Sequence, residues 1–141
     1  MSKLLARLSD AAKSGVYSAP HPEDILDATR GSPLQVARID LGGAAGKGAL
    51  LDRIAAALAF PDWFGRNWDA LEDCLADLSW SKARGHVLVF ESADGLAAQD
   101  REVLVETLGS AAAHWRGRDR PFFAVFLGEA TGLPPLYRRR R

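Results

Sequence analysis

Four carboxylates recur at spacings of three and four residues within a segment that begins at residue 67. They are Asp69, Glu72, Asp73 and Asp77. Placed at 100° steps they share one arc of a helix, and the opposite arc is apolar. Asp69–Asp73 and Asp73–Asp77 put like charges at i,i+4, and each such pair destabilises a helix by roughly 0.2–0.5 kcal/mol. No basic residue on this helix relieves the repulsion, so the arc indicates a surface that binds positive charge, with a merely solvated face as the alternative.

Acid–base catalysis by two of these carboxylates is a weaker interpretation, because raising a carboxyl pKa requires burial and this arc faces solvent. The chain contains no Gly-x-Ser-x-Gly sequence and no cluster of His and Cys at metal-ligand spacing. Cys74 falls on the apolar arc, where a buried, inert thiol is expected. We interpret the histidines as structural or surface residues; they are His21, His86 and His114. We therefore expect no enzyme, no catalytic residue, no metal and no cofactor.

The residues around the acidic arc indicate how it is held. Asn67 is a suitable N-cap for the helix, since its side-chain oxygen can accept a backbone N–H of the first turn. Leu71 and Leu75 form the core-facing arc, with Trp68 at its edge. Trp63 and Phe64 precede the helix beside a glycine, in a turn that cannot easily bury both rings.

The rest of the chain predicts a small α/β fold. We expect strands at residues 34–41, 86–91 and 122–127, and helices at 49–58 and 96–114. This order favours a small three-stranded parallel sheet packed with helices. The glycine-rich loop at 42–48 meets neither the Walker-type nor the dinucleotide-binding pattern, so we interpret it as a flexible connection.

Residues 61–75, PDWFGRNWDALEDCL, resemble the signature of the barstar family, the intracellular inhibitors of barnase-type ribonucleases. The family pattern is a proline, an acid, two aromatics, Gly-x-Asn-x-Asp-Ala-Leu-x-Asp and often Cys. The resemblance extends over about residues 34–128. It implies a barstar-like fold with a three-stranded parallel sheet, an acidic helix exposed at one side, and no enzymatic activity. It also implies that Trp63 packs on the partner while Phe64 points inwards.

The resemblance gives the acidic arc a role. A ribonuclease holds phosphates with Arg, Lys and His, and carboxylates of an inhibitor can occupy those positions through charge-assisted hydrogen bonds. Asp73 is the expected anchor and Asp69 the second. The predicted partner-binding set is Trp63, Gly65, Asn67, Trp68, Asp69, Glu72 and Asp73. Every fixed position of the pattern is met, but the best-known family member has an aromatic residue where Glu72 stands and an acid where Arg66 stands, which implies a cognate enzyme other than the familiar one.

The expected partner is therefore a basic ribonuclease or toxin-type nuclease. The alternative is a non-inhibitory interaction or regulatory module that binds a non-nuclease partner through its N-terminal segment or its arginine tail. No stretch approaches the roughly 20 apolar residues needed to span a bilayer. The chain has one cysteine, which favours the cytoplasm because it cannot form an internal disulfide. The sequence does not indicate an oligomeric state.

The 141 residues divide into three predicted parts. Residues 1–33 form an N-terminal extension with a short helix and a loop, residues 34–132 form the barstar-like domain, and residues 133–141 form an arginine-rich tail. Formal net charge is zero, but the last four residues are arginines, so the rest of the chain is acidic on balance. We expect the tail to be disordered and solubilising, and direct nucleic-acid binding is less favoured.

Overall fold

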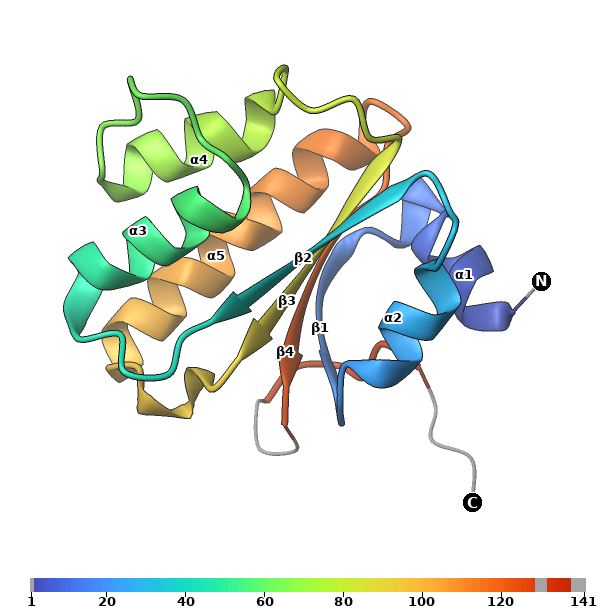
Figure 1. The fold of residues 1–141 in the computed structure, drawn as a ribbon, viewed down its shortest axis with the longest axis horizontal. Helices are drawn as coiled ribbons and strands as arrows, with labels where there is room; N and C mark the ends of the chain where they lie inside the picture. Colours follow the sequence, from blue (N-terminus) through green and yellow to red (C-terminus); the bar gives the residue numbers. More distant parts are fainter. Residues whose placement is uncertain (1, 129–131, 138–141) are drawn as a thin grey trace.

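A four-stranded parallel sheet organises the structure, a computed structural model that describes residues 2–128 and 132–137. Its strands are β1 (Gly15–Ala19), β2 (Leu34–Asp40), β3 (Gly85–Glu91) and β4 (Phe122–Leu127). Their spatial order is β1-β4-β3-β2, and all three neighbouring pairs are parallel (Figure 1). The α/β class and the parallel sheet are confirmed, but the expected number of three strands is wrong for the described part of the chain.

The additional strand, β1, comes from the segment predicted to be an extension. It pairs with β4 in the register Gly15↔Phe123 to Ala19↔Leu127. Its sequence, GVYSA, contains two residues that favour strands, Val16 and Tyr17, but the segment is only five residues long, and pairing with the edge of β4 makes it part of the sheet. The side-chain oxygen of Ser14 accepts the backbone N–H of Phe122 at 2.9 Å, which anchors the start of β1 beside β4.

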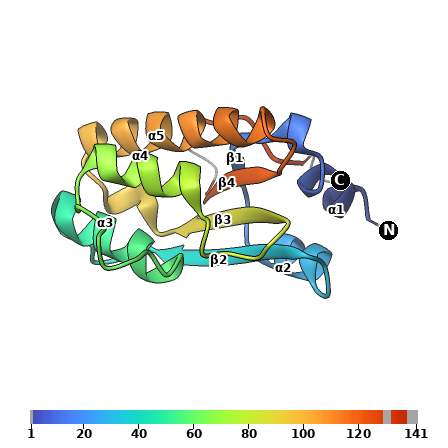
Figure 2. The ribbon, with the colours of Figure 1, turned by 90° about the horizontal axis from the view of Figure 1, so that it is seen from above.

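Three helices cover one face of the sheet: α3 (Gly46–Ala57), α4 (Trp68–Asp77) and α5 (Ala98–Arg116). Together with β2, β3 and β4 they bury the larger core, in which the rings of Phe90 and Phe126 stack with their centroids 4.7 Å apart. Helix α4 lies alongside α5 and touches the sheet less directly (Figure 1 and Figure 2). This placement leaves one side of α4 free for solvent.

The opposite face of the sheet is covered by α1 (Lys3–Leu8), α2 (Glu23–Thr29) and residues 132–137 (Figure 1). Their buried side chains include Leu8, Ile25 and Leu136, each 0% exposed. Two short 3₁₀ helices complete the elements, η1 (Ala11–Lys13) and η2 (Ala93–Gly95). Segment 1–33 thus contributes an edge strand and part of a covering layer, while its separation from residues 34–132 as a distinct unit stays a prediction.

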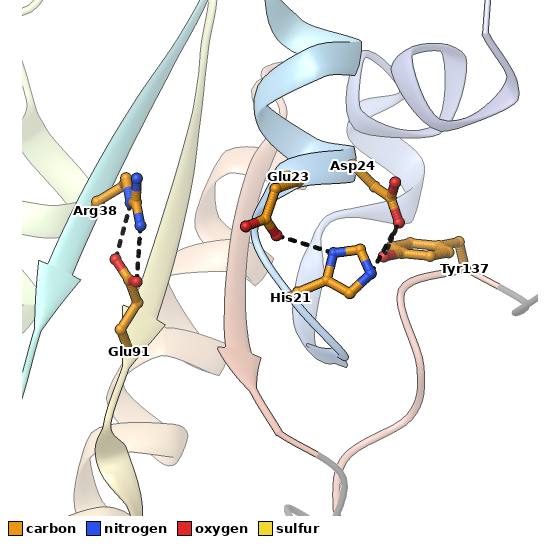
Figure 3. A network of polar contacts seen from close by, with 6 residues as sticks. All are labelled: His21, Glu23, Asp24, Arg38, Glu91 and Tyr137. Atoms are coloured by element: carbon orange, nitrogen blue, oxygen red, sulfur yellow. Dashed lines mark hydrogen bonds and ion pairs between the residues drawn. The ribbon is translucent and has the colours of Figure 1, made fainter.

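The C-terminal segment is held to β1 and α2 by polar contacts. The backbone N–H of Leu136 donates to the Ser18 carbonyl at 2.8 Å, so this segment covers the outer edge of β1. The Tyr137 hydroxyl donates to the Asp24 carboxylate at 2.7 Å, beside His21 (Figure 3). The tail predicted to be disordered and solubilising was residues 133–141; residues 133–137 are described, with Leu136 buried, and residues 138–141 lie outside the described residues. Among the helices that are described, none combines the length and apolar character that a bilayer-spanning segment needs.

Candidate functional site

Helix α4 has a defined beginning and end. Asn67 has extended backbone angles, and its side-chain oxygen accepts the N–H of Ala70 at 2.7 Å, which confirms the predicted N-cap. The helix ends at Leu78, which adopts a left-handed conformation at φ 48° and donates its backbone N–H to the Cys74 carbonyl at 3.1 Å. The Leu78 side chain is buried. The two fixed ends set which residues of α4 face the core.

The inner face of α4 is a scaffold. Leu71, Cys74 and Leu75 are each 0% exposed, as predicted from their arc. The indole N–H of Trp115 on α5 donates to the Leu75 carbonyl at 2.7 Å, and this buried bond ties α4 to α5. Rotation of α4 would break this bond and expose the apolar side chains, so packing determines the direction of the opposite face.

The outer face of α4 is acidic. Asp69, Glu72, Asp73 and Asp77 are all exposed. Within the part of the chain that the structure describes, none of them forms an ion pair, and the hydroxyl of Ser79 donates to Asp77 at 3.3 Å. Some other carboxylates are paired: Asp27 contacts Arg30 at the end of α2, and the half-buried Glu91 contacts Arg38 on β2. The structure therefore leaves on α4 a concentration of negative charge available to a basic partner.

The field of these carboxylates reaches the buried side of the helix. Burial raises the pKa of the Cys74 thiol, and the nearby charges of Asp77 and Asp73 raise that pKa further. The thiol therefore stays protonated and unreactive, in agreement with its predicted structural role. Among the described residues, no group of three or more His, Cys, Asp or Glu side chains is placed to hold a metal ion.

The turn before α4 carries an exposed tryptophan. Trp63 is 65% exposed, and among the described residues it is the only large apolar side chain that is exposed to solvent. Phe64 points inwards and packs edge-on against Phe60 at 5.0 Å between ring centroids. Trp80, whose indole N–H donates to the Leu58 carbonyl at 3.0 Å, packs edge-on against Trp63 at 6.3 Å. An outward Trp63 and an inward Phe64 are the placements that the family resemblance implied.

The other predicted site residues are placed unequally. Glu72 shares the outer face of α4 with the two aspartates, whereas Trp68 is half-buried and packs against the core. The Asn67 side chain is occupied in capping the helix. At Gly65 an added Cβ would meet the Cβ of Ala70 at 3.4 Å, an ordinary contact, so the geometry of this turn does not require glycine. The role of all seven residues in binding a partner stays a prediction.

Sequence reasoning missed two residues beside this surface. Trp80 lies in a polar segment, SWSKARG, to which sequence reasoning assigned no role, although a tryptophan among polar residues is itself a signal of packing. Arg66 was noted only as a difference from the best-known family member, and its partner is Asp52 on α3. The two residues are 14 positions apart, so no local spacing rule connects them.

A comparison with known families places this geometry in context. The sequence model of the family described as Barstar (barnase inhibitor) matches residues 34–127, from the start of β2 to the end of β4. The chain belongs to the barstar family. The matched region contains the whole of α4 and the turn that carries Trp63. No curated protein matches the chain.

Proposed function

We propose that this barstar-family protein binds and blocks the basic active site of a barnase-type ribonuclease through the outer face of α4. The observation that carries the proposal is the acidic face of α4, Asp69, Glu72, Asp73 and Asp77. It forms no ion pair within the described residues and lies on a helix that the family match includes. A stable fold has no need of four uncompensated carboxylates on ten residues, since like charges at i,i+4 destabilise a helix. Their retention is explained by a partner that supplies the positive charge.

The proposed mechanism follows from the negative charge of α4 and from the positions of Asp73 and Asp69 on its outer face. Asp73 has an acidic neighbour at i−4 and at i+4, so it lies at the centre of the negative potential and enters the phosphate-binding part of the enzyme. Asp69 takes a second phosphate position, one turn towards the N-terminus. Both accept charge-assisted hydrogen bonds from arginine or lysine of the enzyme, bonds roughly twice as strong as neutral ones. The bound helix then excludes RNA from the phosphate positions.

The neighbouring residues complete the proposed interface. Trp63 covers the rim of the enzyme site with its exposed ring, and Trp68 and Glu72 flank the two aspartates. Asn67 and Gly65 hold the entry to the helix and allow close approach of the backbone. Members of this family are inhibitors and not enzymes, so no catalytic role is proposed for any of these residues. We place the complex in the cytoplasm, where a single unpaired thiol remains reduced.

Inhibition of RNA cleavage tests the proposal. A panel of barnase-type ribonucleases, barnase among them, is titrated with the wild-type chain and with Asp73→Ala, Asp69→Ala and the double variant. We expect stoichiometric inhibition of at least one enzyme by the wild type. Each single variant weakens inhibition at least tenfold, as expected for charged hot-spot residues, and added salt weakens it for the wild type.

Asp27→Asn is the matched control, because Asp27 is an exposed acid on α2 at the other face of the sheet. It should inhibit like the wild type. The proposal is wrong if the Asp69→Ala/Asp73→Ala variant inhibits as well as the wild type, or if the wild type inhibits no member of the panel.

A further inference from the structure

Arg66 is the single basic residue among five acids in the segment 60–78, and the structure turns it away from them. Its Nε donates to one carboxylate oxygen of Asp52 at 2.8 Å, and its Nη2 donates to the other at 2.9 Å. This is the bidentate geometry in which an arginine–carboxylate pair is most specific. The pair joins the turn before α4 to the middle of α3.

Two residues of α3, Gly48 and Asp52, lie against the Arg66 side chain. Gly48 lies one helical turn before Asp52, on the same side of α3. A Cβ built at Gly48 would lie 3.5 Å from the Nη2 of Arg66, an ordinary contact, so the guanidinium lies against α3 at Gly48. The guanidinium of Arg66 therefore contacts the Asp52 carboxylate and lies over the helix backbone at Gly48.

The backbone at Arg66 also needs support. Arg66 has φ 54°, in the left-handed region that residues other than glycine rarely adopt. It lies directly before the Asn67 cap and three residues after Trp63. A contact that fixes the Arg66 side chain therefore also fixes the turn that presents the exposed tryptophan and begins the acidic helix.

We propose that Asp52 is a positioning residue for the partner-binding face. It holds Arg66 on α3, which keeps the one local positive charge from neutralising Asp69 three residues later and keeps the turn carrying Trp63 in place. The inference rests on the proposed function, because it concerns how the same acidic surface is kept available. The partner then meets a neutral Arg66–Asp52 pair beside an acidic face and is not repelled by a free arginine.

A double-mutant cycle separates this role from a simple effect of charge. Association rates are measured at low salt for the wild type, Asp52→Asn, Arg66→Gln and the double variant. The probe is the panel ribonuclease that the wild type inhibits most strongly. We expect Asp52→Asn to slow association roughly two- to fivefold when Arg66 is present, a size typical of an exposed ion pair. The same substitution should have little effect in the Arg66→Gln background.

A matched cycle uses the exposed pair on α2, in which Arg30 contacts Asp27 at 3.0 Å. Asp27→Asn and Arg30→Gln change the net charge by the same amounts on the other face of the sheet. Their effects on association should be small and additive. An equal effect of Asp52→Asn in both Arg66 backgrounds would overturn the inference, because it would show long-range attraction without any control of Arg66.

Hydrogen exchange in the free protein provides a second measurement that requires no partner. The Phe64 amide donates to the Pro61 carbonyl at 3.1 Å within the turn. Its exchange should be at least threefold faster in Asp52→Asn than in Asp27→Asn or the wild type. Unchanged exchange at Phe64 also overturns the inference. If Asp73→Ala leaves the association rate unaltered, the proposed function fails instead, and the exchange measurement alone decides whether Asp52 positions the turn.

Discussion

Replacement of Asp73 by asparagine should stabilise the fold while it weakens partner binding. Asp73 is exposed, has acids four residues away on both sides, and forms no ion pair within the described part of the chain. Loss of its charge removes two repulsions of roughly 0.2–0.5 kcal/mol each, which gives a gain of about 0.4–1 kcal/mol in the free energy of unfolding. For a chain of this size the melting temperature should rise by about 1–5 °C.

Urea denaturation at two salt concentrations measures this gain. At low salt the repulsions act fully, whereas at 1 M salt the screening length is about 3 Å and exposed charges hardly interact. The stability difference between Asp73→Asn and the wild type should therefore shrink towards zero at high salt. A change in the urea slope is not expected, because the substitution leaves the buried surface unaltered.

Asp69→Asn is the internal comparison, because it relieves one of the same repulsions at the other end of the row. Asp69 lies in the first turn of α4, where a negative charge interacts favourably with the helix dipole. Loss of this favourable interaction with the dipole should cancel most of the free energy gained by relieving the repulsion. The free energy of unfolding of Asp69→Asn should therefore stay close to that of the wild type. Asp73→Asn is thus expected to be the more stable of two chemically identical substitutions.

Destabilisation by Asp73→Asn, or a gain that persists at high salt, would refute this reasoning. Either result would mean that the carboxylate makes a stabilising contact, and the acidic face would then be a structural feature. Stabilisation combined with weaker inhibition has the opposite implication. It identifies a residue that the fold tolerates at a cost and that binding requires.

Three further predictions concern the scaffold. His86 is buried, and its burial together with the charge of Arg120 lowers its pKa from 6.5 to about 4. At a pH between these values the unfolded chain therefore binds a proton that the native state does not. The free energy of unfolding should fall by about 3 kcal/mol as pH decreases between these values, and by much less in His86→Gln, as measured by urea denaturation across pH. Asn67→Ala should remove the α4 cap and lower stability by about 1 kcal/mol in urea. Leu136→Ala should cost about 2–5 kcal/mol of unfolding free energy, because its side chain is fully buried against the sheet; a smaller loss would show that the C-terminal segment is not packed there.

The central strands and the acidic helix were predictable from local sequence. The runs at 87–90 and 122–127 are continuous and apolar because β3 and β4 have helices on both faces, and burial on both sides requires such residues. The cap, the buried arc and the outer arc of α4 follow from spacing alone, since a helix converts sequence intervals directly into directions. The opposite orientations of Trp63 and Phe64 were expected from the family resemblance.

Features that depend on distant partners were not predictable in this way. Val16 and Tyr17 favour an extended conformation, but β1 joins the sheet only because β4 offers it an edge, and that pairing is not visible in its own residues. Likewise, nothing near Arg66 indicates that its guanidinium meets Asp52, because the contact is created by how the turn before α4 folds back on α3. Both features arise from tertiary structure, where pairing overrides local preference.

The additional strand changes how a role for the N-terminal segment can be tested. Deletion of residues 1–33 would remove β1 and α2 and expose the face of the sheet that Ile25 and Leu8 cover. Loss of binding after such a deletion would report unfolding as readily as a missing contact. Substitution of exposed residues on α2, such as Glu23 and Asp27, leaves the covering layer intact. Binding that weakens in those variants but not in Asp73→Ala would favour a non-inhibitory module, and the reverse pattern favours the inhibitor.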